Sequence, residues 1–306
     1  MDALFDVAAP AKVNLFLHVI GRRSDGYHLL QSLFVLIDWC DTLHFERRAD
    51  GALARHDLGP ALPPDDLCLR AARLLQAQSG TAYGADISID KSIPWGAGLG
   101  GGSSDAAATL LALNRLWGLH WERDRLLALG LQLGADVPFF VGGHHAMVEG
   151  IGERLTPVEV PGQWLAVVKP PASIETRAIF ANALLKRDSE PVILASFTQN
   201  ASKEGLRGRP TPDRLPRVTG PEVFAGWGRN DLQAAAEAEC VQVTEAAALL
   251  QTEFGNSRMT GSGSAVFARA GTGSAPDRPL PSLAPGWQGR MCRSLVAHPL
   301  VTWSAD

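Results

Sequence analysis

The feature that most restricts the possible folds is a glycine cluster. Pro94–Gly102 contains five glycines in nine residues and is followed by Ser103, Ser104 and Asp105. The alternation in Asp86–Asp90 predicts a strand before it, and the apolar spacing in Ser104–Trp117 predicts a helix after it. Glycines allow positive φ angles and a close approach of bare backbone N–H groups to a ligand. A helix N-terminus adds free donors and partial positive charge, so the cluster predicts a phosphate-binding loop.

Three common nucleotide-binding motifs do not explain this loop. Gly96, Gly98 and Gly101 match G-x-G-x-x-G, but that pattern requires a strand ending in an acidic residue beyond the helix. The segment Gly118–Asp124 does not have the composition of a buried parallel strand. No Gly-Lys-Ser/Thr occurs, which excludes a Walker loop, and neither His-Arg-Asp nor Asp-Phe-Gly of the protein kinases is present. The loop is therefore a phosphate loop of another type.

Composition and charge exclude several broad classes. The 306 residues carry 28 basic and 32 acidic side chains, a net charge of −4, with 46% apolar residues. These values are typical of a globular chain and exclude disorder, and a basic face for nucleic acid is not expected. No apolar run is long enough to span a membrane, and Met1–Pro10 lacks the features of a secretory signal. We expect a cytoplasmic protein with no nucleic-acid or membrane partner, whose four scattered cysteines are reduced packing residues.

The order of expected elements indicates an α+β fold with a boundary near residue 160. Further strands are predicted at Val13–Val19, Leu29–Asp38, Ala146–Glu149, Leu165–Val168 and Ala265–Ala268, and further helices at Asp65–Gln78, Asp124–Leu133, Arg177–Leu185, Asp231–Cys240 and Thr244–Phe254. Lys203–Pro221 and Gly271–Gly286 are predicted loops, because both are rich in proline or glycine.

Four ordered segments resemble the GHMP kinases, the family of galactokinase, homoserine kinase and mevalonate kinase. The glycine cluster is similar to the family's central motif ahead of a helix. Pro10–Leu15 with Gly21–His28 resembles the amino-terminal signature of the branch that acts on cytidine diphosphate methylerythritol. Gly134–Phe140 resembles that branch's catalytic-Asp segment, and Met259–Ala268 resembles the family's carboxy-terminal glycine motif.

The resemblance implies an activity, cofactors and a two-domain architecture. The expected reaction transfers the γ-phosphoryl group of ATP, with Mg²⁺ as second cofactor, to the 2-hydroxyl of the cytidine diphosphate sugar alcohol in the non-mevalonate isoprenoid route. The implied ATP-binding domain, residues 1–160, is similar to ribosomal protein S5 domain 2. The implied substrate-binding domain, residues 161–306, is ferredoxin-like. A monomer or weak homodimer is expected.

Two residues are expected to be catalytic. Asp136 matches the family's catalytic aspartate, which accepts the proton of the acceptor hydroxyl or orients it. Without the family, Asp136 before Val137 and Pro138 is also a plausible helix N-cap. Lys12 lies in an apolar strand, where an unpaired ammonium is costly, and Asp136 is its expected partner. The alternative for Lys12 is a strand-edge lysine that extends to water.

The resemblance also implies residues that bind the two substrates. Tyr27 and His28 match a pair that recognises cytosine, one by stacking and the other through the edge of the base, although aromatic residues are more often part of a core. The remaining expected substrate contacts are Asn14, Phe34, Thr176 and Phe180. Lys91 either faces the nucleotide phosphates or is an ordinary strand-end lysine. The hydroxyls of Ser103 and Ser104 either cap the helix or reach phosphates and Mg²⁺. The expected nucleotide contacts are thus Lys91, Pro94, Trp95, Gly96, Ala97, Gly98, Leu99, Gly100, Gly101, Gly102, Ser103 and Ser104.

Other features receive weaker functional interpretations. His144 and His145 are neighbours in a strand and point to opposite faces, so no metal site is expected there. The basic residues of Lys203–Arg217 are expected in a solvated loop, and this stretch and Arg293–Trp303 match the family poorly. The competing functions are a kinase for another small alcohol, a nucleotide-binding protein without catalysis, and a redox enzyme. Retention of Tyr27 and His28 argues against the first, and retention of both Lys12 and Asp136 argues against the second.

Overall fold

The computed structural model describes residues 1–192, 198–199, 215–218 and 228–305. The described strands are β1 (Ala3–Arg22), β2 (His28–Arg48), β3 (Leu53–Asp57), β4 (Gly84–Asp90), β5 (Ala146–Gly150), β6 (Arg154–Pro157), β7 (Trp164–Lys169), β8 (Thr198–Gln199), β9 (Arg217–Val218), β10 (Arg258–Met259), β11 (Val266–Arg269) and β12 (Gln288–Arg293). The described helices are α1 (Leu67–Ser79), α2 (Gly101–Leu116), α3 (Arg123–Leu133), α4 (Val137–Gly142), α5 (Thr176–Ala181), α7 (Gln233–Glu239) and α8 (Val241–Phe254).

A long hairpin of β1 and β2 organises the first sheet. Five of its six strands follow the order β3-β4-β2-β5-β6, and the sixth strand, β1, pairs with β2. Only the β3–β4 pair is parallel among the described pairs of this sheet. Residues two apart in a strand share a face, so Lys12 and Asn14 of β1 lie on one side of the hairpin, opposite Leu36 and Phe34 of β2.

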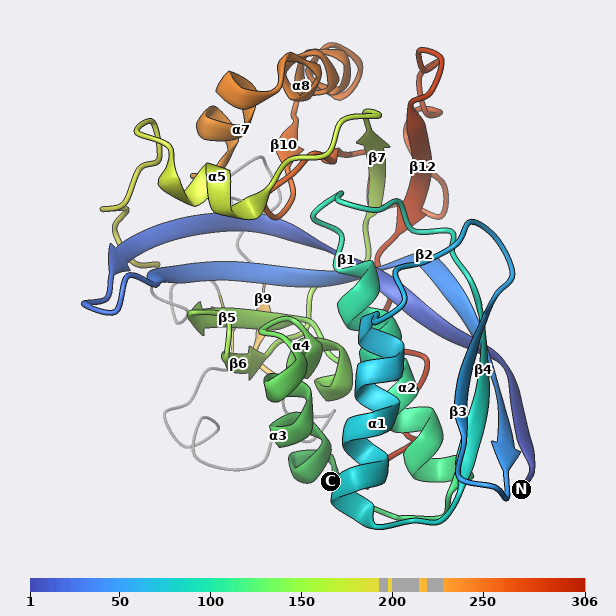
Figure 1. Cartoon of the computed structure of the whole chain (residues 1–306). Coiled ribbons are helices and arrows are strands. Elements are labelled where there is room, and N and C mark those ends of the chain that lie inside the picture. The colour runs from blue at the N-terminus through green and yellow to red at the C-terminus, as the bar shows by residue number, and fades with distance from the viewer. Residues whose placement is uncertain (193–197, 200–214, 219–227, 306) are drawn as a thin grey trace.

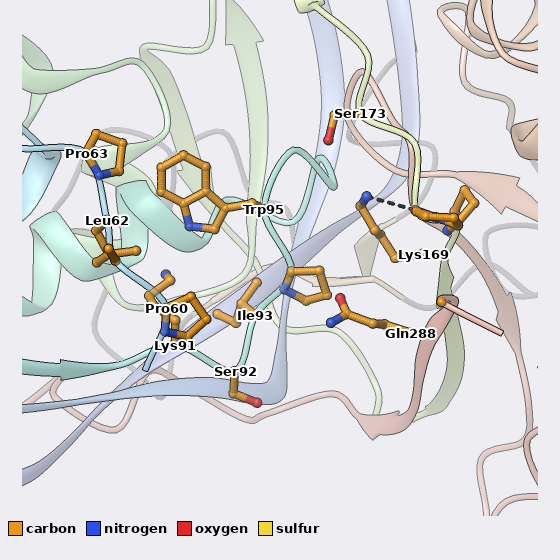
Figure 2. A pocket seen from close by; sticks show the side chains of 15 residues that line it. Pro60, Leu62, Pro63, Lys91, Ser92, Ile93, Trp95, Lys169, Ser173 and Gln288 are labelled. Atoms are coloured by element: carbon orange, nitrogen blue, oxygen red, sulfur yellow. Dashed lines mark hydrogen bonds between the residues drawn. The ribbon is translucent and has the colours of Figure 1, made fainter. Parts of the chain in front are cut away.

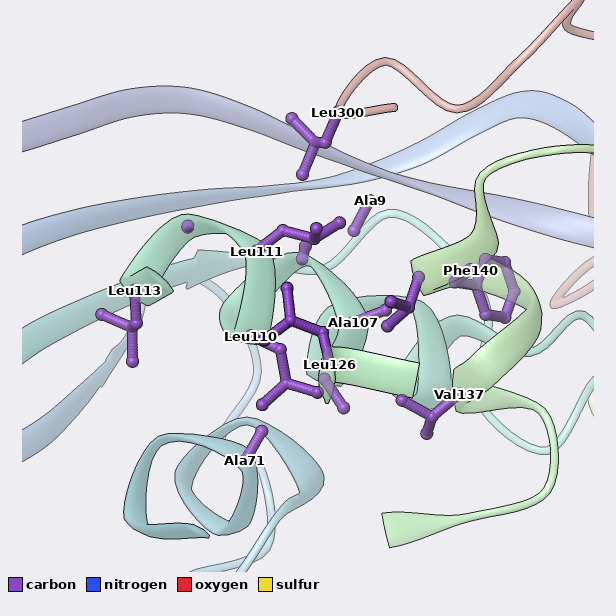
Figure 3. Packing of buried hydrophobic residues seen from close by; sticks show 14 of the residues in the cluster. Ala9, Ala71, Ala107, Leu110, Leu111, Leu113, Leu126, Val137, Phe140 and Leu300 are labelled. Carbon is purple, nitrogen blue, oxygen red and sulfur yellow. The ribbon is translucent and has the colours of Figure 1, made fainter. Parts of the chain in front are cut away.

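Helices α1–α4 cover one side of this hairpin, whereas α5, α7 and α8 lie on its other side (Figure 1). The largest core cluster packs α1, α2 and α4 against the sheet (Figure 3). Alanines of α2, among them Ala107, are fully buried and permit close packing there. Leu300 of the carboxy-terminal tail joins the same cluster, so the tail returns to the first sheet.

The second sheet is antiparallel, with the order β10-β11-β7-β12. One of its faces packs on α7 and α8 through a core that includes Val168, Leu250 and Val266. Its other face packs on the first sheet through a core that includes Val13 and Val167. The two sheets therefore share a buried core, which fixes the position of one relative to the other.

Most sequence-predicted elements are present, and four elements differ from the prediction. The α+β class is confirmed, and Gly271–Gly286 forms a loop without helix or strand. The helix predicted over Arg177–Leu185 is wrong in extent, because α5 ends at Ala181. α4 and the strands β3 and β12 were not predicted, since each is short or lacks clean alternation. Lys203–Pro221 falls mostly outside the described residues. None of the helices in the described part of the chain has the length and apolar character that a bilayer crossing requires.

Candidate functional site

The glycine cluster forms a loop that is fixed on two sides by backbone hydrogen bonds. The amide of Lys12 donates to the carbonyl of Leu99 at 2.9 Å, which joins the loop to β1. The amide of Ala265 donates to the carbonyl of Ala97 at 3.1 Å, which joins it to the carboxy-terminal glycine motif. Gly98 has a φ of +73°, and a Cβ atom there would lie 2.2 Å from the carbonyl oxygen of Thr260. Glycine is therefore required at 98 both by conformation and by space.

Two cavities meet at this loop. The loop cavity, of about 390 Å³, is lined by Pro94–Ser103 and Asp105 together with Leu62, Pro63 and the start of α1. The acceptor cavity, of about 320 Å³, is lined by β1, β2, α5 and the motif Gly261–Gly263. Gly96, Gly98 and Gly100 line both cavities. A phosphoryl donor in one cavity and an acceptor in the other would thus meet across three glycines.

Lys12 and Asp136 lie together in the acceptor cavity, as the sequence predicted. Lys12 is 3% exposed, and its Nζ lies 3.7 Å from Asp136 Oδ2. The same ammonium donates to Asn14 Oδ1 at 2.7 Å and lies 4.6 Å from the ring centre of Phe34. Burial lowers the pKa of Lys12, against the opposing charge and hydrogen bond of Asp136. The alternative of a strand-edge lysine in water is wrong.

The carboxylate of Asp136 is not occupied by helix capping. Asp136 precedes α4, but its side chain makes no capping hydrogen bond. The side chain is 34% exposed, so it is open to the acceptor cavity while remaining beside Lys12. The N-cap interpretation of Asp136 is therefore wrong at the level of the side chain, and the carboxylate remains available to a ligand.

Asn14 connects strand β1 to the carboxy-terminal glycine motif. Its Oδ1 accepts from Lys12, from Thr260 Oγ1 at 3.1 Å and from the amide of Gly261 at 2.9 Å. Its Nδ2 donates to Ser32 Oγ at 2.9 Å, which uses one of the two amide hydrogens. Asn14 lines the acceptor cavity, and its hydrogen bond to the ammonium positions Lys12 there.

Three further predicted substrate residues line the acceptor cavity: Phe34, Thr176 and Phe180. Phe34 is 6% exposed and meets Phe139 edge-on, with ring centres 5.2 Å apart. The hydroxyl of Thr176 lies 2.7 Å from that of Ser262. These contacts make a rigid wall from β2, α5 and the carboxy-terminal motif.

The predicted cytosine pair is split. His28 stacks on Phe180, with ring centres 4.9 Å apart and an interplanar angle of 23°. Burial, followed by the charges of Arg187 and Arg22, lowers the pKa of His28. Tyr27 is 60% exposed and is not among the residues that line the acceptor cavity. Of the two, only His28 is therefore tied to a cavity-lining residue.

Lys91 lines the loop cavity, but its ammonium pairs with two carboxylates. It donates to Asp41 and Asp105, both buried. Burial acts to lower the pKa of Lys91, and the two carboxylates raise it. Burial and the charge of Asp41 raise the pKa of Asp105, against the pull of Lys91. The lysine thus anchors the loop through Asp41, which also accepts from the amides of Ser92 and Ile93.

Ser103 and Ser104 lie in the first turn of α2, which begins at Gly101, and neither caps it, because the helix has no side-chain capping hydrogen bond. Ser103 lines the loop cavity, whereas Ser104 is fully buried and its hydroxyl has no partner among the described residues.

His145 accepts from the amide of Leu36 at 3.1 Å, and burial lowers its pKa to about 4, so it is a neutral packing residue. The described residues contain no cluster of three or more His, Cys, Asp or Glu side chains suited to a metal ion.

A third cavity, of about 760 Å³, adjoins the loop cavity and shares Pro94 and Trp95 with it. In the view of Figure 2, the indole of Trp95 lies between Pro63 and Lys169. Trp95 is 55% exposed, which is high for an indole. Lys169 donates to the carbonyls of Pro170 and Ala172, each at 2.8 Å. The loop cavity therefore opens toward a larger space with an aromatic wall.

Comparison with known proteins agrees with this geometry. Residues 66–144 match the GHMP kinases N terminal domain family. A 4-diphosphocytidyl-2-C-methyl-D-erythritol kinase of Methylibium petroleiphilum is 61% identical over 307 residues, covering 99% of both chains. The chain belongs to the 4-diphosphocytidyl-2-C-methyl-D-erythritol kinase family. The family's member from Albidiferax ferrireducens is 52% identical and covers 100% of this chain and 97% of its own.

Solved structures give the same family and fold. The crystal structure of a 4-(cytidine 5'-diphospho)-2C-methyl-D-erythritol kinase superposes with a TM-score of 0.69 and 35% identity, covering 88% of this chain and 90% of that chain. Homoserine kinase from Cytophaga hutchinsonii has a TM-score of 0.64 and 16% identity, covering 97% and 96%. The second likeness shows the fold alone. The chain is therefore a kinase with the two-domain GHMP kinase fold.

Several residues of the site were not singled out by sequence reasoning. Asp41 and Asp105 hold Lys91, while Thr260 and Ser262 contact Asn14 and Thr176. Thr260 and Ser262 lie inside the carboxy-terminal glycine motif, so the sequence motif could have pointed to them as site residues. Asp41 gave no signal, since it follows an expected strand as many acidic residues do.

Proposed function

We propose that this chain transfers the γ-phosphoryl group of ATP to the 2-hydroxyl of 4-diphosphocytidyl-2-C-methyl-D-erythritol, with ADP and the 2-phosphate as products. The observation that carries the proposal is the Lys12–Asp136 pair in a cavity that meets the glycine loop. The names of the relatives, which cover almost the whole chain, support the choice of acceptor.

ATP is proposed to occupy the loop cavity. Backbone amides of the glycine loop and the N-terminus of α2 supply hydrogen-bond donors and partial positive charge to its phosphates. Ser103 is the proposed hydroxyl contact, because it lines the cavity and is not used for capping. The wall formed by Leu62, Pro63 and Trp95 offers an apolar surface to the base.

Mg²⁺ is proposed to enter with ATP. This ion prefers oxygen ligands, keeps several waters and is usually bound through one or two protein oxygens plus phosphates. The donor set around the loop fits that description, since Ser103 and Asp136 each present oxygen atoms beside it. When bound, the ion would neutralise charge on the β- and γ-phosphates.

The proposed mechanism leaves positioning and charge stabilisation to the protein. Asp136 accepts the proton of the 2-hydroxyl or orients its lone pair toward the γ-phosphorus. Lys12, held by Asn14, keeps Asp136 ionised and stabilises charge that develops on the moving phosphoryl group. The buried wall formed by Phe34 and Phe139 excludes water from the ammonium.

The proposed division of labour places ATP binding in residues 1–160 and acceptor binding mainly in residues 161–306. Lys12, Asn14 and Phe34 nevertheless come from the first part. The amino-terminal hairpin is therefore proposed to serve both substrates.

The decisive experiment measures Mg-ATP-dependent ADP release with the cytidyl substrate beside mevalonate and homoserine. Turnover with the cytidyl substrate alone is expected. Turnover with mevalonate or homoserine instead would refute the assignment of the acceptor. ATP binding without turnover on any of the three would favour a non-catalytic nucleotide binder, and Asp136→Asn serves as the inactive control.

A further inference from the structure

Arg187 is a side chain to which the proposed mechanism gives no role, yet it joins two elements at the acceptor cavity. It lies in the segment that follows α5. Its Nη2 donates to the carbonyls of Phe180 at 3.1 Å and Asn182 at 3.0 Å, and its Nη1 donates to that of Leu185 at 3.1 Å. Its Nε lies 3.2 Å from Nε2 of His28, the first residue of β2. Hydrogen bonds to three carbonyls thus fix the guanidinium that contacts the imidazole.

This contact determines where the imidazole carries its proton. A guanidinium is always protonated and has no acceptor atom. Nε2 of His28 must therefore accept the hydrogen bond, and a neutral ring then has its hydrogen on Nδ1. Within the described part of the chain, that Nδ1 makes no hydrogen bond. The result is a neutral ring whose free polar atom is a donor.

The ring is also fixed in orientation. It stacks on Phe180, whose side chain lines the acceptor cavity and whose carbonyl is bound by Arg187. The same guanidinium therefore positions both members of the stack. An imidazole that could rotate or exchange its tautomer would present a donor and an acceptor in turn, and would not distinguish bases.

A fixed donor distinguishes the two common pyrimidines. Cytosine has an acceptor at N3, whereas uracil has an N–H donor there. A donor on the protein can pair with the first and opposes the second, which is how an interface rejects a near-identical ligand. We propose that Arg187 is a positioning residue that fixes His28 as the Nδ1–H tautomer against Phe180, so that the site selects cytosine over uracil. This inference rests on the proposed function for its substrate class.

The test asks whether residue 187 must be a group that can only donate a hydrogen bond to His28, whatever the shape of its side chain. Arg187→Gln can still bind carbonyls, but its amide can also accept, which frees the tautomer of His28. Arg187→Lys can only donate and keeps the positive charge. Lys186→Gln removes a charge from the adjacent exposed residue and is the matched control.

The first readout is the kcat/KM ratio for the cytidine diphosphate substrate over its uridine analogue. We expect Arg187→Gln to lower this ratio about tenfold, the factor that one hydrogen bond represents. The change should lie in KM for the cytidine substrate, with kcat nearly unchanged. Arg187→Lys and Lys186→Gln should keep the ratio of the parent protein. An unchanged ratio in Arg187→Gln, or an equal loss in the Lys and Gln variants, would overturn the inference.

The second readout needs no turnover. The ¹⁵N chemical shifts of the imidazole, assigned by their loss in His28→Gln, report which nitrogen carries hydrogen. The parent protein should show Nδ1–H, and Arg187→Gln should shift toward Nε2–H. An Nε2–H ring in the parent protein contradicts the inference. If the cytidyl substrate is not turned over at all, the proposed function fails. The imidazole spectrum, with calorimetric affinities for cytidine diphosphate and uridine diphosphate, still decides the role of Arg187.

Discussion

Replacement of Lys12 by methionine should abolish most catalysis without lowering stability. Lys12 is 3% exposed, so its ammonium has lost nearly all of its hydration. Methionine keeps an unbranched side chain whose Cγ can pack beside Gly100, as the Cγ of Lys12 does: a Cβ added at Gly100 would lie 3.2 Å from it. Replacing a buried charge by an apolar side chain is often neutral or stabilising when no polar partner is left unpaired.

After this replacement, both polar partners of the Lys12 ammonium keep other hydrogen-bond partners or water. Asn14 Oδ1 retains donors from Thr260 at 3.1 Å and Gly261 at 2.9 Å. The side chain of Asp136 is 34% exposed and remains hydrated. We therefore expect the free energy of unfolding to stay the same or rise by up to about 2 kcal/mol, below the upper end of measured cases because Asp136 is only partly buried. The value of kcat should fall by about 10²–10³, as when one preorganised donor to a transition-state charge is removed.

A second buried lysine provides the contrast. Lys169→Met removes the donor to the carbonyl of Pro170, which has no other donor among the described residues. That change should cost about 1–3 kcal/mol, the penalty of an unpaired buried acceptor. Urea unfolding at pH 7 and steady-state ADP release measure both effects. If Lys12→Met were less stable than Lys169→Met, or kept kcat within tenfold of the parent protein, the reasoning about Lys12 would be refuted.

Three further perturbations test other parts of the site. Asp136→Asn should lower kcat by about 10²–10⁴ with little change in melting temperature, because its side chain caps no helix; a clear loss of stability in calorimetry would restore the capping role. Gly98→Ala should abolish ATP binding in calorimetry and lower stability, because φ is +73° and the carbonyl of Thr260 is 2.2 Å from the added Cβ. Gly142→Ala, with no atom within 4 Å of its Cβ, should bind ATP normally. Burial lowers the pKa of Lys12 below 10.5, and the reaction needs the protonated form, so kcat/KM should fall as pH rises through that lowered value; a flat profile up to pH 10.5 would contradict the role.

The same lowered pKa has a consequence for stability with the opposite sign. The unfolded chain holds the Lys12 proton up to a pKa of 10.5, whereas the folded chain releases it earlier. In the window between these two values the unfolded state binds more protons, so the free energy of unfolding should rise with pH. Lys12→Met should lose this rise, which urea unfolding across that pH range would detect.

The sequence predicted the parts of the site that depend on local pattern. The glycine loop was predictable because five glycines between a strand and a helix have few structural uses. A polar partner for Lys12 was predictable because an unpaired lysine in an apolar strand is costly, and the resemblance to the GHMP kinases pointed to Asp136, which lies beside it. The first part of this inference uses a rule that holds without knowledge of the tertiary structure, whereas the choice of Asp136 needed the family.

Contacts that depend on which distant or loop residue reaches a side chain could not be predicted. Lys91 was placed at the nucleotide, but nothing in the sequence shows that Asp41, about fifty residues earlier, would reach its ammonium. The resemblance implies that Tyr27 and His28 act as a pair, yet strand β2 begins at His28 and leaves Tyr27 on the exposed turn. The helix α5 ends early where Arg187 binds the carbonyls of Phe180 and Asn182. Each outcome was decided by a long-range or loop contact that periodicity does not encode.

In the proposed mechanism, strand β1 links the residues that would serve both substrates. Strand β1 provides Lys12, whose backbone amide holds the glycine loop at Leu99 while its side chain holds Asp136. Any displacement of β1 therefore moves the loop and the ammonium together. Because Asn14 ties the same strand to Gly261, the second sheet moves with them. In the proposed mechanism, β1 therefore positions both the donor phosphate and the acceptor hydroxyl, as an in-line transfer between two cavities requires.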